Sequence, residues 1–140
     1  MNMKNIEKCA IVLSDDLGVG LALNAAAALA LSLGHDFGAS LIGDDIADAS
    51  GTMHRGITRY PLPMLRAPST AVRELVVRAH EADSIYVVTF SSAAQAARDY
   101  DSYREAMAEA ETGEHDYAGL LVAGAKKDVN RLTGSLPLYR

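Results

Sequence analysis

Cysteine is nearly absent from this sequence, and tryptophan is absent altogether. The only cysteine among the 140 residues is Cys9, which excludes an internal disulfide and a metal site built from several cysteines. Cys9 lies in an apolar run, so we expect a buried, unreactive thiol rather than a catalytic one. The four histidines show no metal-ligand spacing, and we therefore predict no metal and no cofactor.

Basic residues are too few for a broad nucleic-acid surface. Lys and Arg number 13 against 18 Asp and Glu, which gives a net charge of −5. Clustered Lys and Arg supply most of the affinity of proteins for nucleic acid. We therefore expect no nucleic-acid partner, although the composition leaves room for a local basic patch that contacts tRNA.

No hydrophobic run reads as a convincing membrane span or signal peptide. The stretch 17–33 is largely apolar, but it is short for a bilayer, rich in alanine, and contains Gly18, Gly20 and Asn24. The N-terminal residues lead directly into a predicted strand. We interpret the stretch as a core helix and expect a cytoplasmic protein without a membrane partner.

Alternating strand and helix patterns predict one domain over residues 1–140. Apolar, β-branched runs predict strands at residues 10–13, 39–43, 85–89 and 117–124, and prolines assign residues 61–66 to a sheet edge. Helical patterns follow at residues 20–33, 69–79, 92–111 and 125–133. We therefore expect a three-layer α/β/α sandwich with a mixed, mostly parallel sheet of four to five strands.

Single residues set the predicted helix boundaries. Gly34 is placed to end the first helix, and Ser69 or Thr70 to cap the second. The long third helix presents tyrosines and a methionine at helical spacing, which we assign to the core or to an interface: Tyr100, Tyr103 and Met107.

The first candidate site is the turn after the first strand, with Asp16, Gly18, Gly20 and Asn24. A glycine-rich turn before a helix exposes backbone N–H groups to a ligand. Alternatively, the glycines serve a tight turn and Asp16 caps the helix. Asn24 interrupts an apolar helix, so its amide contacts either a ligand or a structural hydrogen-bond partner.

The second candidate site lies in the last predicted helix. Lys126 and Lys127 fall at its N-terminus, where the helix is already partly positive, so together they would hold an anion. The alternative is two solvated lysines on a surface helix. Thr133, beside the predicted helix stop Gly134, either closes the helix end or joins the site.

The third candidate site is the end of the strand 85–89. Thr89 and Ser91 fall at its carboxyl end, where open α/β sheets place ligands. Alternatively, Ser91 caps the next helix, on which Gln95 and Arg98 face the same cleft. The sequence leaves open whether the three candidate sites share one cleft.

Several segments together resemble the peptidyl-tRNA hydrolase II superfamily over nearly the whole chain. The opening strand, turn and alanine-rich helix are similar to the start of that fold, and the Leu-Thr-Gly-Ser-Leu ending is similar to its close. The middle looks like an uncharacterised bacterial branch that carries only a domain-of-unknown-function label. The segments that carry the likeness to this branch are 54–57, 61–66, 94–103, 124–129 and 132–140.

The resemblance implies the fold of those hydrolases and frequent pairing into homodimers. Matched without gaps, Leu21 and Leu23 occupy positions where the hydrolases carry lysines, and Ala30 occupies a histidine position. Asp15 and Asp16 make the same corner acidic, which repels phosphate.

Three functional hypotheses follow, and the residues do not decide whether the protein is an enzyme. The first is a protein that binds a small anionic ligand. The second is a diverged hydrolase of peptidyl-tRNA or a related ester. The third is a homodimeric interaction module, with the proline-bearing segment and the tyrosine helix at its interface.

Overall fold

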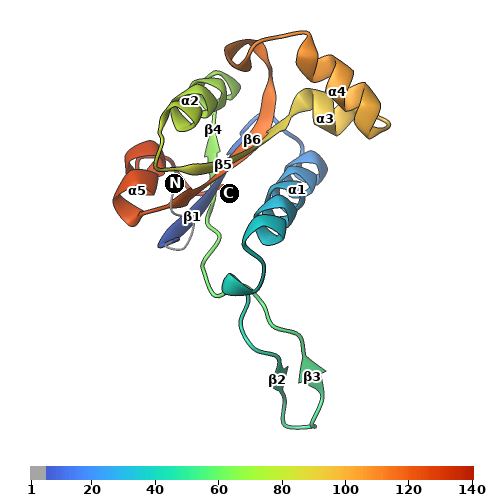
Figure 1. Ribbon diagram of the computed structural model, residues 1–140, viewed down its shortest axis with the longest axis vertical. Helices are drawn as coiled ribbons and strands as arrows, with labels where there is room; N and C mark the ends of the chain where they lie inside the picture. The colour runs from blue at the N-terminus through green and yellow to red at the C-terminus, as the bar shows by residue number, and fades with distance from the viewer. Residues whose placement is uncertain (1–5) are drawn as a thin grey trace.

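A four-stranded mixed sheet lies at the centre of the protein, for which the computed structural model describes residues 6–140 (Figure 1). The strands are β1 (Lys8–Ser14), β4 (Met64–Ala67), β5 (Tyr86–Ser91) and β6 (Tyr117–Gly124). They lie in the order β4-β1-β6-β5, with β1 parallel to β4 and β6 antiparallel to β1 and β5. The sheet is mixed and four-stranded, as predicted, but the expectation of mostly parallel pairing is wrong, because only β1 and β4 pair parallel and the other two neighbouring pairs are antiparallel.

Helices cover both faces of this sheet, in agreement with the expected α/β organisation. Helix α1 packs on one face, and α2 and α5 pack on the other (Figure 1). The helices are α1 (Val19–Phe37), α2 (Ser69–Glu81), α3 (Ser92–Ala96), α4 (Tyr100–Ala108) and α5 (Lys126–Thr133). Two short 3-10 helices are η1 (Gly38–Ser40) and η2 (Thr112–Glu114).

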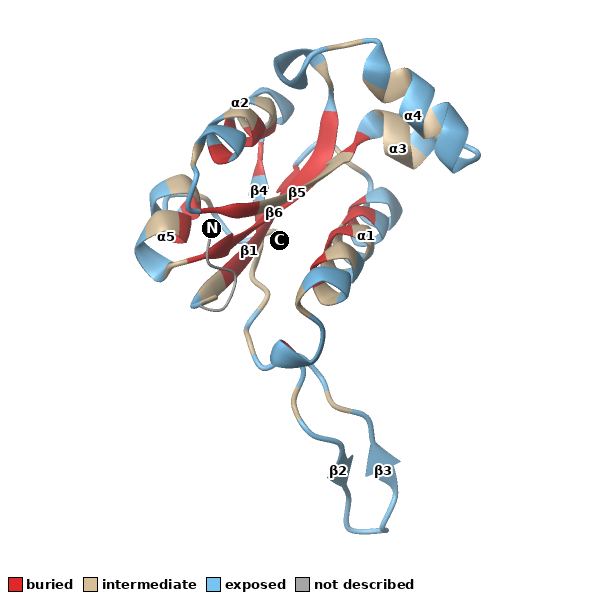
Figure 2. Ribbon diagram, in the orientation of Figure 1, coloured by how far each residue is buried: buried red, intermediate tan, exposed pale blue. Residues whose placement is uncertain are grey.

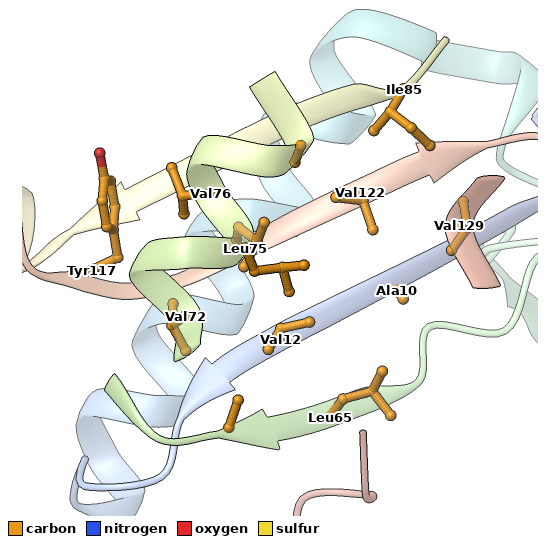
Figure 3. Close-up of a cluster of buried hydrophobic side chains, with 13 residues drawn as sticks. Ala10, Val12, Leu65, Val72, Leu75, Val76, Ile85, Tyr117, Val122 and Val129 are labelled. Atoms are coloured by element: carbon orange, nitrogen blue, oxygen red, sulfur yellow. The ribbon is translucent and has the colours of Figure 1, made fainter. Parts of the chain in front are cut away.

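Strands β1 and β6 form the core because they are apolar on both faces. Ala10 and Val12 point toward α2, whereas Ile11 and Leu13 point toward α1. Figure 2 shows both strands buried along most of their length, and Figure 3 shows the cluster on the α2 side. Cys9 is buried here, as predicted, and burial raises the pKa of its thiol to about 11.

Residues 42–60 form an arm that projects from the body (Figure 1). Its strands β2 (Ile46–Ala47) and β3 (Met53–His54) pair antiparallel with each other. The strand predicted at residues 39–43 is wrong: η1 occupies its start, and Ile42 makes only an isolated bridge to Thr58. The segment cannot join β1, because β4 and β6 already occupy both edges of that strand.

Two predicted helix boundaries are also wrong. Helix α1 continues through Gly34 and ends at Gly38, whose φ of 53° suits a residue without a side chain. Pro68, rather than Ser69 or Thr70, occupies the N-cap of α2.

The predicted long helix 92–111 is two helices. Ala97 is extended, and the carboxylate of Asp99 accepts from the Ser102 N–H at 2.7 Å to begin α4. Helix α4 has no buried residue, and Tyr100 is 71% exposed, so the core alternative for the tyrosine helix is wrong and the interface alternative stays a prediction. The competing N-cap at Asp99 explains the break, because it offers the backbone a second helix start.

Candidate functional site

A polar cleft opens where β1 and β4 end and α2 begins. It has a volume of about 390 Å³. Its lining residues are Ser14, Asp16, Leu17, Ser69, Ser92, Asp116 and Tyr117. Ligands of α/β sheets bind outside the carboxyl ends of the strands, which is where this cleft lies.

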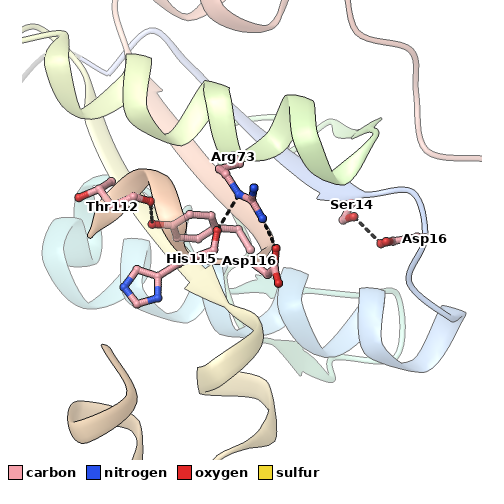
Figure 4. Close-up of polar contacts among 7 residues, drawn as sticks. Ser14, Asp16, Arg73, Thr112, His115 and Asp116 are labelled. Carbon is pink, nitrogen blue, oxygen red and sulfur yellow. Dashed lines mark hydrogen bonds and ion pairs between the residues drawn. The ribbon is translucent and has the colours of Figure 1, made fainter. Parts of the chain in front are cut away.

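Ser14 and Asp16 form one side of the polar cleft (Figure 4). The buried Ser14 hydroxyl donates to the exposed Asp16 carboxylate at 2.5 Å. Asp16 does not cap α1, because the N-cap is Gly18 and no side-chain hydrogen bond closes that end. The Asp16 carboxylate can therefore accept further hydrogen bonds from a ligand in the cleft.

Asp116 and Tyr117 form the opposite side of the polar cleft, and Arg73 holds Asp116 in place from behind this side (Figure 4). Its guanidinium forms an ion pair with Asp116, and its Nε donates to the His115 carbonyl at 3.0 Å. Tyr117 donates to the Thr112 carbonyl at 2.7 Å, and burial raises the pKa of its phenol. This side is thus fixed by internal contacts, with the Asp116 charge compensated.

The N-terminus of α2 completes the polar cleft. Its N-cap is a proline, no side chain hydrogen-bonds to the first turn, and no acidic residue lies in that turn. Ser69, the first helical residue, lines the cleft. The first N–H groups of a helix have no intrahelical partner, so this end offers donors to a ligand.

Of the predicted glycine-turn residues, Asp16 lines the polar cleft, whereas Gly18, Gly20 and Asn24 do not. Gly18 and Gly20 are exposed, and a side chain at Gly20 would meet no atom within 4 Å. Asn24 is also exposed, and its carbonyl oxygen lies 3.4 Å from the Gln95 amide nitrogen. The structure therefore gives Asn24 the hydrogen-bond partner that the alternative reading expected.

Thr89 and Ser91 separate into different environments. Thr89 lines an apolar pocket of about 330 Å³ between α1, β5 and α4, which also contains Arg98. Ser91 is buried, and its hydroxyl accepts from the Ala94 N–H at 3.0 Å as the N-cap of α3. The capping alternative for Ser91 is thus what the structure shows.

Lys126 and Lys127, which follow Gly124, lie at the other end of the sheet. The register pairs Gly124 with Lys8, at the start of β1, whereas Ser14 ends that strand. Six strand residues separate these ends by about 20 Å. The three candidate sites therefore do not share one cleft.

The lysine end carries few contacts that suggest a site. Both lysines are exposed, and no ion pair among residues 6–140 includes either of them. Thr133 is buried and donates to the Val129 carbonyl at 2.8 Å, which closes the helix end. Residues 6–140 also contain no group of three His, Cys, Asp or Glu side chains placed to hold a metal ion.

No pattern in the sequence indicated that Ser14, Ser69, Ser92 and Asp116 line one cleft. Strand ends β1 and β4 were visible in the sequence, and their parallel pairing brings Ser14 and Ser69 to one edge. The antiparallel placement of β6, which brings Asp116 to the same edge, had no local signal in the sequence.

The fold and cleft define a mixed α/β protein with a polar cleft at its strand ends. The sequence matches the family model described as Protein of unknown function (DUF2000) over residues 7–140, and the chain belongs to this family.

The solved structure of the protein of unknown function Atu0240 from Agrobacterium tumefaciens strain C58 is similar to this chain. The TM-score is 0.86 at 22% sequence identity, and the match covers 95% of this chain and 97% of the other. This likeness shows a shared fold. No curated protein matches the sequence.

Proposed function

We propose that the protein binds a small polar ligand in the polar cleft, with an anionic group of the ligand at the N-terminus of α2. The observation that carries the proposal is the open first turn of α2, which has no side-chain cap and no acidic residue and borders the cleft at Ser69. Backbone N–H groups and the helix dipole both favour an anion there.

The acidic side of the polar cleft narrows the ligand class. Asp16 accepts hydrogen bonds, so it favours an ammonium or hydroxyl group and disfavours a multiply charged phosphate. A ligand with a carboxylate at α2 and a donor at Asp16 satisfies both ends. We therefore propose an amino acid or a small hydroxy acid, rather than an anion bound by Lys126 and Lys127.

A Ser69→Pro substitution tests the role of the helix end, because proline is tolerated at the first helical position but removes its N–H. The matched control, Ser69→Ala, keeps that N–H. The affinity of Ser69→Pro for amino acids and small hydroxy acids, measured by calorimetric titration, should be lower than that of the wild type by a factor of about 10 or more. The reason is that a hydrogen bond to a charged group contributes about 1.5–3 kcal/mol.

Asp16→Asn should lower the affinity for the same ligand. The fold should stay intact, because Asp16 is exposed. Equal affinities for the wild type and both cleft variants, Ser69→Pro and Asp16→Asn, would contradict the proposal. Binding that is lost only in a Lys126→Ala, Lys127→Ala variant would move the site to α5.

Hydrolysis of peptidyl-tRNA or a related ester is a second candidate function. The hydrogen bond between the Ser14 hydroxyl and the Asp16 carboxylate favours it, because a carboxylate can orient a hydroxyl or a water for attack. The layered mixed sheet also agrees with the peptidyl-tRNA hydrolase II-like fold that the sequence resemblance implies. Peptidyl-tRNA turnover that disappears in Asp16→Asn would support this candidate, and no turnover at high protein concentration would reject it.

A further inference from the structure

We infer that the protein forms a two-fold homodimer in which the arm, residues 42–60, of each copy packs on the outer face of α1 of the other copy. This inference is independent of the polar cleft. It rests on two apolar surfaces that the chain leaves uncovered.

The arm exposes its large apolar residues to solvent (Figure 2). Ile46 is 67% exposed, Met53 is 61% exposed and Ile57 is 77% exposed. Strands of two residues give the arm no core of its own, and an isolated hairpin is marginal in water.

Polar contacts nevertheless give the arm a defined shape. The Asp48 carboxylate accepts from the Ser50 and Thr52 N–H groups and lies 2.8 Å from the His54 ring, while Asp45 accepts from the Gly56 N–H at 2.7 Å. A preorganised arm with exposed apolar residues is suited to docking, because little ordering entropy remains to be lost.

The outer face of α1 is the second uncovered surface. Val19 is 74% exposed, Leu23 is 66% exposed and Leu31 is 77% exposed. Their spacing of four and eight residues, with exposed Ala27 between, makes one stripe along the helix. No charged residue occurs between Val19 and Gly34, whereas a solvated helix face normally carries charges.

A second copy of the chain is the occupant that covers both surfaces at once. The arm extends away from α1 of its own chain, so the two surfaces cannot meet within one copy (Figure 1). In a two-fold dimer each contact is made twice, by the arm of either copy on the partner helix. The arm and the outer half of α1 together supply roughly the 20–30 residues a side of a standard interface.

Sedimentation equilibrium of paired charge variants tests this arrangement. The arm variant is Met53→Lys with Ile57→Lys, and the helix variant is Leu23→Glu with Leu31→Glu. The wild type should be dimeric at micromolar concentration, and each variant alone should be monomeric at that concentration.

Mixing the two variants should restore a dimer. The mixture retains one unaltered arm on one unaltered helix, and the second contact sets Lys against Glu. Variants that each stay monomeric when mixed would overturn the arm-to-helix contact in favour of arm-to-arm or helix-to-helix pairing. All substituted residues are exposed, and circular dichroism verifies that each variant is folded.

Tyr100→Glu is the matched control, because Tyr100 is equally exposed but lies on α4. Tyr100→Glu should remain dimeric. If Tyr100→Glu were monomeric while the arm variant stayed dimeric, the interface would lie at α4 instead. By length and composition alone, the segment Val19–Ser40 is also apolar enough to cross a membrane. A monomeric wild type would overturn the inference, as would α1-dependent binding of that monomer to anionic phospholipid vesicles.

Discussion

The buried serine and threonine side chains form hydrogen bonds with residues two to four positions away in the sequence. Ser14 donates to Asp16, Ser91 accepts from Ala94, and Thr133 donates to the Val129 carbonyl. An unpaired buried hydroxyl is costly, so each of these contacts stabilises a strand or helix end. Of the three serine and threonine residues, Ser14 is the one that borders the polar cleft.

The Cys9 thiol should react slowly in the folded protein. Burial raises its pKa from 9.0 to about 11, so at pH 8 the thiolate fraction falls about 100-fold relative to the unfolded chain. The folded protein without urea should react with a chromogenic disulfide reagent at least about 100-fold more slowly than the protein unfolded in urea. Equal rates would show that the β1 strand is open to solvent.

The same pKa shift sets a pH dependence of stability. Because the folded pKa is raised, the folded state favours the neutral thiol, and this contribution is fully present below about pH 9. The free energy of unfolding should fall as the pH rises from 9 to 11. A Cys9→Ser variant provides the control, because it lacks this titration.

At the scale of the element, caps decide where the helices after β5 begin and end. Ser91 begins α3 and Asp99 begins α4, although the intervening sequence is rich in good helix formers. The extended backbone of Ala97 separates the two helices. Local hydrogen bonding therefore overrides helix propensity here.

Ser91→Ala should lower the free energy of unfolding by about 1 kcal/mol, because it removes the N-cap of α3. The neighbouring Ser92→Ala is the matched control, since Ser92 is exposed and makes no capping bond; it should change stability by less than about 0.5 kcal/mol. Urea denaturation measures both. Equal stability of the two variants would contradict the capping role.

For the whole molecule, the C-terminal segment protects one edge of the sheet. The Arg66 N–H donates to the Pro137 carbonyl at 3.0 Å, and the Tyr139 N–H donates to the Met64 carbonyl at 2.8 Å. These bonds lie along β4, the outer strand beside β1. They cover backbone groups that would otherwise template pairing with another chain.

Removal of residues 137–140 should therefore destabilise the protein and promote aggregation. The loss of two backbone hydrogen bonds and of Tyr139 packing should cost at least about 2 kcal/mol. Removing Arg140 alone is the control. An unchanged urea midpoint with no increase in light scattering would show that β4 needs no cover.

The sequence by itself determined the α/β class, the buried strands β1 and β6, the presence of β5, and the helix stop after Thr133, whereas β5 is a half-buried edge strand rather than the buried strand expected. These features follow from local chemistry, because apolar periodicity, β-branched runs and a terminal glycine act within a few residues. The break at Asp99 was missed because two local signals, helix propensity and capping, compete there.

Only the tertiary structure decided which ends of the strands meet. The antiparallel pairing of β6 with β1 separates Lys126 and Lys127 from Asp16 and brings Asp116 to the polar cleft instead. The arm cannot pair with β1, because β4 and β6 occupy both edges of that strand. Strand order depends on contacts between distant residues, which a pattern along the chain does not encode.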